Sequence, residues 1–472
     1  MSKGRRLVSL VAVTTTAAAM SIVGLSGSAG AATGPGYLRL PGSVAPFTSH
    51  THAISAVKGS TPLTVQIWMK PGNLAAAERY ATAVSTPGSK LFHHYLSPDA
   101  YTARFGTSRT ATSKVEAWLR SKGFTGFSTD AQRNYVRATA SVATIDAAFK
   151  ITMQNYASTA KVNAGTYQLR ANNKPVAIPK SLAKYVIGVT GLDNAAPRLP
   201  LLHGPIPQAS GVKFPKVPCS KFYGQHHEGK LPRAFGRTSF PTQICGYGAF
   251  QMRAAYGMTM KNDGHGQTVS LVELGLAQDM FLTLKDLTKL QHFVPPTSHR
   301  YTELSLGKNS CGDPFAVEEQ LDVETSYDMA PGANQLVIGG DGCNNGDFGL
   351  QGLFNADIVN IDGMGSDHHP LSTISSNSWG PGTDIQPAIF TNIMHTYLVR
   401  AAAQGVGMYF ASGDASGVET PDDPFTILVG GTTLAVGHHD KRLFETGWSA
   451  GFSGDIRNHW VLFGEEGASS AN

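Results

Sequence analysis

Charged residues and cysteines are scarce in this sequence of 472 residues. Asp, Glu, Lys and Arg make up only 15% of it and 41% is hydrophobic, which excludes a long disordered chain and allows sizeable cores. The formal net charge is +5, and Lys3, Arg5 and Arg6 supply three of those charges. No clustered basic face is evident, so we expect no nucleic-acid partner. The length predicts two or three domains.

Long apolar runs are missing beyond the N-terminus. A basic start, Lys3 to Arg6, precedes a mostly apolar stretch from Leu7 to Val23, and small residues follow with Ala29 and Ala31 in cleavage spacing. This pattern predicts a secretory signal peptide over residues 1–31 and a secreted, extracellular protein with no membrane partner. A membrane anchor is the alternative, but the stretch is short and interrupted by threonines. The paired arginines leave the general secretory and twin-arginine routes open.

Only four cysteines occur, and all lie in the second half: Cys219, Cys245, Cys311 and Cys343. An even count in an exported chain favours disulfide bonds. Pairing by sequence proximity would join the first to the second and the third to the fourth, although four cysteines allow three connectivities. The absence of a Cys-x-x-Cys motif makes a metal site the weaker interpretation.

Residues 32–193 show mixed strand and helix patterns. Apolar and polar residues alternate from Leu63 to Lys70, which predicts a strand, and Asn73 can cap a helix that ends before Pro87. This mixture predicts a small α+β domain of ferredoxin-like type. Residues 194–218 then carry six prolines and read as an extended linker, either a processing region or a plain spacer.

Residues 219–472 follow a different pattern, in which short apolar runs alternate with helical stretches. The runs are residues 267–273, 335–340, 371–379, 406–412 and 427–431, and the clearest helices are 317–330 and 388–404. Buried strands alternating with helices predict an α/β fold with a parallel sheet. In such sheets, functional side chains gather at the carboxyl ends of the strands.

Two acidic features stand out in this second half. Glu318 and Asp322 are four residues apart in a helical stretch, so they share one face, while Glu319 points elsewhere. They are either a solvated acidic face or a coupled pair in which one carboxylate acts as a base and the other orients it. Asp414 follows the run ending at Phe410 in a Gly/Ser turn, where it either serves an active site or forms an Asx-turn.

The chain resembles the sedolisin family, the serine-carboxyl peptidases with a subtilisin-like fold. In the second half the resemblance rests on these motifs: Tyr247 with Arg253-Ala-Ala-Tyr-Gly257, Glu318-x-x-x-Asp322 before Met-Ala-Pro-Gly-Ala, Ser376-Asn-Ser-Trp-Gly380 and Ser412-Gly-Asp414. In the first half, Pro87 to Pro98 and Phe105-Gly106 resemble the family's pro-kumamolisin-type activation prodomain. The resemblance implies a prodomain over residues 32–193 and a partial peptidase domain over residues 219–472.

The resemblance also implies a role for each matching residue. Glu318 would be the general base, Asp322 would hold and polarise it, and Asp414 would donate a hydrogen bond to the oxyanion. An ionised carboxylate only accepts hydrogen bonds, so Asp414 must be protonated and the site should work in acid. Glu273 and Trp379 match positions that extend the carboxyl network in some members, or are simply a strand-end charge and a core indole.

The family's nucleophile, a serine in a Gly-Thr-Ser motif downstream of the oxyanion aspartate, is missing: no Gly-Thr-Ser follows Asp414. The Ca²⁺ ligands expected for complete members would lie in the same downstream region, so no metal site can be placed. We therefore expect a C-terminally truncated chain that is inactive as it stands. An incomplete gene model, a frameshift and a decayed gene would each explain it, and the coding sequence after codon 472 would decide among them.

Three functional hypotheses follow. The first is a secreted acid endopeptidase precursor, a monomer that acts on proteins and peptides and is inhibited by its own prodomain. The second is an inactive secreted remnant, or a prodomain-type inhibitor. The third is a metal-binding protein, suggested by four histidine pairs: His93-His94, His226-His227, His368-His369 and His438-His439. Adjacent histidines point to opposite faces of a strand and these pairs are scattered, which argues against the third.

Overall fold

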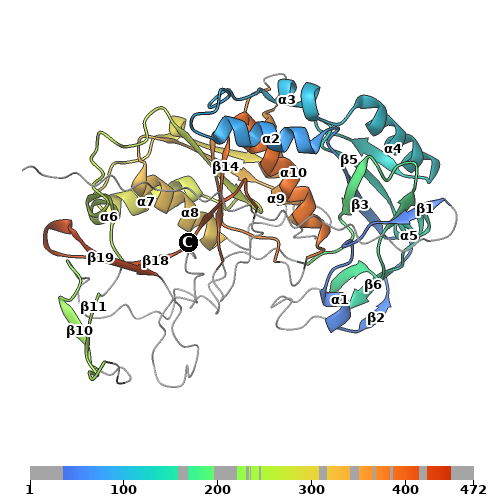
Figure 1. Cartoon of the computed structure of the whole chain (residues 1–472). Helices are drawn as coiled ribbons and strands as arrows, with labels where there is room; N and C mark the ends of the chain where they lie inside the picture. Colours follow the sequence, from blue (N-terminus) through green and yellow to red (C-terminus); the bar gives the residue numbers. More distant parts are fainter. Residues whose placement is uncertain are drawn as a thin grey trace, which may run out of the picture.

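The computed structural model describes residues 36–157, 168–195, 220–229, 233, 235–243, 246–307, 316–340, 350–364, 368–382, 386–413 and 423–447. They form an N-terminal α+β domain and a second domain built on a parallel sheet (Figure 1). The predicted fold class, a parallel α/β sheet preceded by a small α+β domain, is confirmed. Within the described part of the chain, no helix is both long and apolar enough to cross a bilayer.

The N-terminal domain has a ferredoxin-like core. Its four-stranded antiparallel sheet has the order β4-β5-β3-β9, and the connection β3-α4-β4-β5-α5-β9 gives the split βαβ arrangement. The elements of the domain are β1 (Tyr37–Arg39), α1 (Phe47–His50), β2 (Ala53–Ala56), β3 (Pro62–Met69), α2 (Leu74–Ser85), α3 (Pro98–Phe105), α4 (Arg109–Ser121), β4 (Thr125–Ser128), β5 (Tyr135–Ser141), α5 (Val142–Phe149), β6 (Met153–Tyr156), β7 (Leu169–Asn172), β8 (Ala177–Pro179) and β9 (Val186–Thr190).

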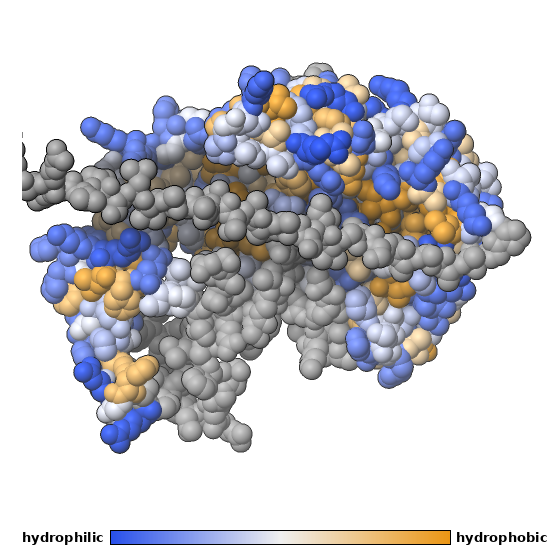
Figure 2. Space-filling model, viewed as in Figure 1, coloured by the Kyte–Doolittle hydropathy of each residue, from blue (hydrophilic) through white to orange (hydrophobic). Residues whose placement is uncertain are grey.

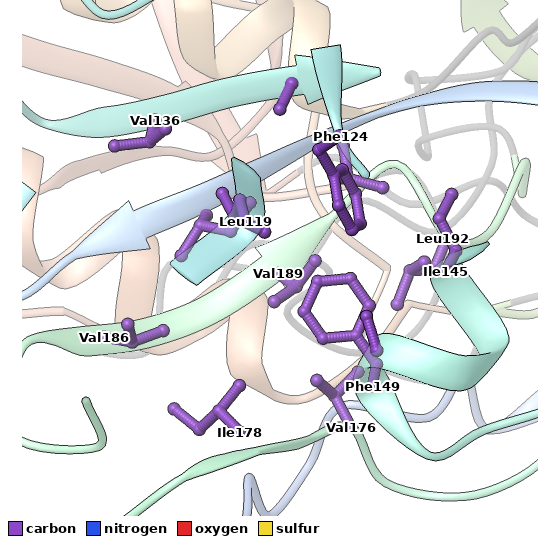
Figure 3. Close-up of a cluster of buried hydrophobic side chains, with 14 of the residues drawn as sticks. Leu119, Phe124, Val136, Ile145, Phe149, Val176, Ile178, Val186, Val189 and Leu192 are labelled. Atoms are coloured by element: carbon purple, nitrogen blue, oxygen red, sulfur yellow. The ribbon is translucent and has the colours of Figure 1, made fainter. Parts of the chain in front are cut away.

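Local sequence explains these elements. The Asn73 side chain accepts a hydrogen bond from Ala76 N at 3.1 Å and so caps α2, as predicted. Apolar residues of α4 and α5, such as Leu119 and Phe149, pack on one face of the sheet to form the domain core (Figure 3). Because strand side chains alternate, Val65 and Ile67 of β3 point into this core while the residues between them face the opposite way.

Gly191, just after β9, is held in a conformation that excludes other residues. Its φ is +87°, and a Cβ placed there would lie 2.4 Å from the carbonyl oxygen of Thr64. We expect Gly191→Ala to lower the free energy of unfolding by roughly 2–3 kcal/mol, because backbone strain and a backbone clash add. The matched control is Gly88→Ala, where φ is +84° but no atom lies within 4 Å, so only the strain of about 1 kcal/mol remains. Equal losses in urea unfolding would contradict this account.

The second domain is organised around a six-stranded sheet in the order β13-β14-β12-β15-β16-β17, and every pairing in it is parallel. The strands are β12 (Thr268–Glu273), β13 (Tyr301–Ser305), β14 (Asn334–Gly339), β15 (Ile374–Asn377), β16 (Gly407–Ala411) and β17 (Ile427–Val429). The helices are α6 (Ala249–Ala255), α7 (Met280–Leu290), α8 (Ala316–Met329), α9 (Leu350–Asp362) and α10 (Ile389–Gln404). Two hairpins, a short one of β10 (His226–Glu228) and β11 (Phe240–Thr242) and another of β18 (Thr432–Val436) and β19 (Arg442–Gly447), and the 3₁₀ turns η1 (Ser298–Arg300) and η3 (His438–Asp440) complete it.

Helices cover both faces of this sheet, which is why its strands read as continuous apolar runs. Leu271 of β12 packs with α7 and α8, whereas its neighbour Val272 packs with α9 and α10. Five strands and both helices predicted here are confirmed. Several elements of this domain were not predicted. Among them are β13, an edge strand whose side chains are largely exposed, and α9, which is buried nearly all round and so lacks a helical apolar stripe.

The two domains share a buried interface. The second face of β3 lies against α9: Trp68 is 2% exposed and meets Phe354 edge-to-face at 5.9 Å, and Gln66 exchanges amide hydrogen bonds with Asn355 at 2.8 and 3.2 Å. Helix α2 lies beside α10 (Figure 1). The alternation in β3 predicted one apolar face, and the structure buries the other face too.

Candidate active site

Three of the predicted residues lie at or beside the carboxyl ends of neighbouring strands, and two of them, Glu273 and Asp322, interact with each other. Glu273 is the last residue of β12, and Trp379 follows β15, which pairs with β12. Asp322 comes from α8, which packs on β12. Parallel strands end at the same edge of a sheet, so this is the position at which α/β folds place their sites.

Asp322 is the centre of the cluster. Ser378 Oγ donates a hydrogen bond to Asp322 Oδ1 at 2.9 Å. The carboxyl group of Glu273 also interacts with that of Asp322 and lowers its pKa. Since an ionised carboxylate has no donor, two such groups can share a hydrogen bond only when one of them carries a proton. Sequence analysis quoted Ser378 within a motif but gave it no role.

Burial raises the pKa of Asp322 to about 6, against the lowering effect of its hydrogen bonds with Ser378 and Glu273. A carboxyl group whose pKa is raised by folding stabilises the fold below its ordinary pKa of 3.8, and that contribution is lost as the pH rises through about 6. The Asp322 carboxyl group therefore makes the fold more stable in acid than at neutral pH.

We expect Asp322→Asn to reduce the pH dependence of stability. The wild-type chain should lose up to about 3 kcal/mol between pH 4 and pH 7 from this group, and the variant should not. Ser378→Ala removes a hydrogen bond that lowers the pKa, so it should shift the loss to higher pH. Urea unfolding at pH 4, 5, 6 and 7 measures both effects, and identical profiles in the three proteins would overturn this assignment.

The two glutamates before Asp322 are both buried. Glu318 is 9% exposed, so the alternative of a solvated acidic face is wrong. Glu319 is fully buried, and its Oε2 accepts a hydrogen bond from Ala277 N at 2.6 Å, which ties α8 to the chain just after β12. The sequence places Glu319 on a different face of the helix from Glu318, but it does not indicate that Ala277 is its partner. Leu321, the residue before Asp322 on this helix, is 54% exposed.

Trp379 occupies the core beneath this edge. It is 1% exposed and meets Phe410 edge-to-face at 5.2 Å and Phe354 at 6.0 Å. Its Nε1 is buried with no hydrogen-bond partner among the described residues. The packing is that of a core indole, and no contact in the described structure links it to Glu273 or Asp322.

Asp414 and the four predicted disulfide cysteines, Cys219, Cys245, Cys311 and Cys343, lie outside the described residues. The turn leading to Asp414 is described: it follows β16 at the same sheet edge, and Ser412 N donates to Val429 O at 3.0 Å. Gly413 has φ +110°, which favours glycine at that position.

The sequence does contain one Gly-Thr-Ser, at Gly106 to Ser108 in the N-terminal domain. There the Ser108 side chain accepts a hydrogen bond from Ala111 N at 3.2 Å and caps α4. Gly106 closes against α3, where a Cβ would lie 2.8 Å from Thr102. This serine has a structural position and is not part of the carboxyl cluster.

No group of three or more His, Cys, Asp or Glu side chains is placed to hold a metal ion in the part of the chain that the structure describes. In that part, His368 contacts Asp99 and His395 contacts both Glu78 and Asp423. These histidines of the second domain are thus engaged with carboxyl groups.

Comparison with known proteins finds similarity to sedolisin-type peptidases over most of this chain. The family description "Pro-kumamolisin, activation domain" matches residues 49–195. Xanthomonalisin from Xanthomonas sp. (strain T-22) is 25% identical over 79% of this chain, and sedolisin from Pseudomonas sp. (strain 101) is 23% identical over 82%. The chain is thus similar to xanthomonalisin and sedolisin, and its N-terminal domain matches the pro-kumamolisin activation domain.

The chain spans only part of these relatives, 42% of xanthomonalisin and 62% of sedolisin. A solved structure of Pseudomonas sedolisin, a serine-carboxyl proteinase complexed with two molecules of pseudo-iodotyrostatin, matches 47% of this chain and 61% of its own. That match has 19% sequence identity and a TM-score of 0.35.

Proposed function

We propose that this chain is the secreted precursor of an acid endopeptidase of the serine-carboxyl type. The observation that carries the proposal is the interaction of the Asp322 carboxyl group with that of Glu273, which ends the parallel strand β12, with Ser378 donating to Asp322. A carboxyl pair in this position suits general acid–base work at acid pH. Similarity to xanthomonalisin and to the pro-kumamolisin activation domain supports the same activity.

In the proposed mechanism, Glu318 removes the proton from a serine hydroxyl as that hydroxyl attacks the substrate carbonyl. Asp322, held by Ser378 and Glu273, orients Glu318 one helical turn away and stabilises its protonated form. Protonated Asp414 donates to the oxyanion of the tetrahedral intermediate. The proposal places the nucleophilic serine in coding sequence downstream of Asn472. The ligands for calcium are expected in the same downstream region, and calcium takes part in no step of this mechanism.

The activation domain has a proposed role as intramolecular inhibitor and folding template. Its contacts support this: α2 lies along α10, and Trp68 enters the core of the second domain. Proteins and peptides are the proposed substrates, and disulfide bonds among the four cysteines fit the proposed secretion.

The test uses a chain extended through the coding sequence after codon 472. Incubated with a denatured protein at pH 4, the extended chain should release peptides, and substitution of the serine in a downstream Gly-Thr-Ser by Ala should abolish the release. No hydrolysis at pH 3–5 by a correctly folded extended chain would refute the proposal.

The second candidate function is inhibition. The observation that favours it is the match of residues 49–195 to an activation domain, in a sequence with no Gly-Thr-Ser after Asp414. The 472-residue chain added to an intact sedolisin-family peptidase would then slow peptide release in a dose-dependent way. Hydrolysis of the added chain without inhibition would exclude this function.

A further inference from the structure

The formal net charge of the whole chain is only +5, but its two halves carry net charges of opposite sign. Residues 36–195 contain 18 Lys and Arg against six Asp and Glu, whereas residues 220–472 contain 14 against 27. One explanation is that the opposite charges hold the domains together. The contacts between the domains test that explanation.

In the contacts between the domains the charges are reversed: the N-terminal domain supplies acidic side chains, and the second domain supplies histidines. The N-terminal domain contributes Glu78 and Asp99, which meet His395 at 3.0 Å and His368 at 2.7 Å. Another of its six acidic residues, Asp130, lies near Asp362 and Arg400 of the second domain. Burial and the charge of Asp362 raise the pKa of Asp130 to about 6, although the charge of Arg400 acts to lower it. Three of the six acidic residues of this domain, Glu78, Asp99 and Asp130, therefore interact with charged or titratable groups of the second domain.

A depression on the surface of the N-terminal domain gathers part of its cationic surplus. It has a volume of about 660 Å³ and lies between α4 and the turn that joins β8 to β9. Lys114, Lys180 and Lys184 line it together with Trp118 and Tyr185, and no acidic residue does. We call it the lysine depression. Figure 2 shows hydrophilic side chains spread over the N-terminal domain at the right of the view.

The three lysines of the depression lie close together, and no described acidic side chain forms an ion pair with them. Lys184 Nζ lies 4.9 Å and Lys114 Nζ 5.7 Å from the centre of the Tyr185 ring, and the hydrogen bond with Lys184 lowers the pKa of Tyr185. None of the three lysines forms an ion pair with another described residue. The only acidic residue on α4, Glu116, is bound to Arg120 at 2.5 Å.

The backbone under the depression is well fixed. In the turn, Leu182 N donates to Pro179 O at 2.9 Å and Tyr185 N donates to Leu182 O at 2.8 Å. Leu182 is 6% exposed and belongs to the domain core, and Lys180 N donates to Gly36 O at 2.9 Å. Positions fixed in this way reduce the ordering cost of binding a ligand.

We propose that the lysine depression binds phosphate groups of a polyanion. Lysine ammonium groups are compact charges that bind phosphate oxygens, and three of them around one depression suit several linked phosphates better than one. The site lies on the activation domain and is independent of the proposed peptidase function, so either can fail without the other.

The test uses the full 472-residue chain and inorganic tripolyphosphate as the probe, measured by titration calorimetry at low salt. Lys180→Gln with Lys184→Gln should weaken binding by about tenfold or more, since two charge-assisted contacts are lost. The control, Lys58→Gln with Lys90→Gln, removes the same charge from exposed positions outside the depression and should change affinity by less than about twofold. Melting curves for each variant confirm that the chain is folded.

A second arm identifies the source of the phosphate. If tripolyphosphate releases the chain from phosphatidylglycerol vesicles, a lipid headgroup is a natural source, and if the chain ignores the vesicles but binds tripolyphosphate, the source is soluble. Both results support the site. No binding of tripolyphosphate, or equal losses in the two double variants, would overturn it, because the effect would then reflect net charge alone.

Discussion

Glu318→Gln in the extended chain is expected to lower kcat/KM for peptide hydrolysis roughly 10²- to 10⁴-fold, the usual contribution of a general base. The amide keeps the size of the side chain, which is 9% exposed, but cannot take the serine proton. The loss should appear mainly in kcat, because the base acts in the chemical step and not in substrate binding. Steady-state kinetics at pH 4 with a short peptide measures it.

Glu319→Gln provides the matched control one residue along the same helix. This side chain is fully buried, and a Gln oxygen can still accept the hydrogen bond from Ala277 N. We expect the variant to keep kcat within about tenfold of the unsubstituted extended chain, with its main effect on stability. If Glu319→Gln lost activity and Glu318→Gln did not, the roles proposed for these neighbours would be exchanged and our assignment would be wrong.

Trp68→Ala is expected to lower the free energy of unfolding by about 3–5 kcal/mol, the usual cost of removing a buried indole. Trp68 is 2% exposed, contacts Tyr135 at 5.5 Å and Phe354 at 5.9 Å, and donates from Nε1 to Thr190 Oγ1 at 3.0 Å. Because it belongs to β3 but packs into the core of the second domain, its loss should weaken both domains together.

A double-mutant cycle separates the interface from the general loss of packing. Trp68→Ala combined with Phe354→Ala should show a coupling energy of about 0.5–1.5 kcal/mol, as expected for an edge-to-face aromatic pair. Trp118 is the control: it packs on Phe149 inside the N-terminal domain, so its coupling with Phe354 should be near zero. Zero coupling for the first pair would mean that the two domains do not associate in solution as described.

Periodicity in the sequence was sufficient to predict most of the fold. Strand β3 lies within one residue of the predicted stretch from Leu63 to Lys70, and α2 begins at its predicted cap, Asn73, since alternation and capping are local signals. What could not be predicted were contacts between distant segments. Nothing local marks Gln66 as the partner of Asn355, because the match depends on how β3 approaches α9.

The candidate site shows the same limit. The spacing of Glu318 and Asp322 indicated a shared face, but only the packing of α8 on β12 shows that Asp322 meets Glu273 and Ser378. The raised pKa of Asp322 likewise depends on burial, which the sequence does not specify. Asp414 lies outside the described residues, so its role as oxyanion donor stays a prediction.

The central claim is that the carboxyl cluster around Asp322 forms the active site of an acid peptidase. The most direct test is the pH dependence of kcat/KM for the extended chain between pH 3 and pH 8. The account predicts highest activity at about pH 3–5 and a steep fall as the pH rises through about 6, where Asp322 ionises. Activity that persists or rises to pH 8 would contradict it.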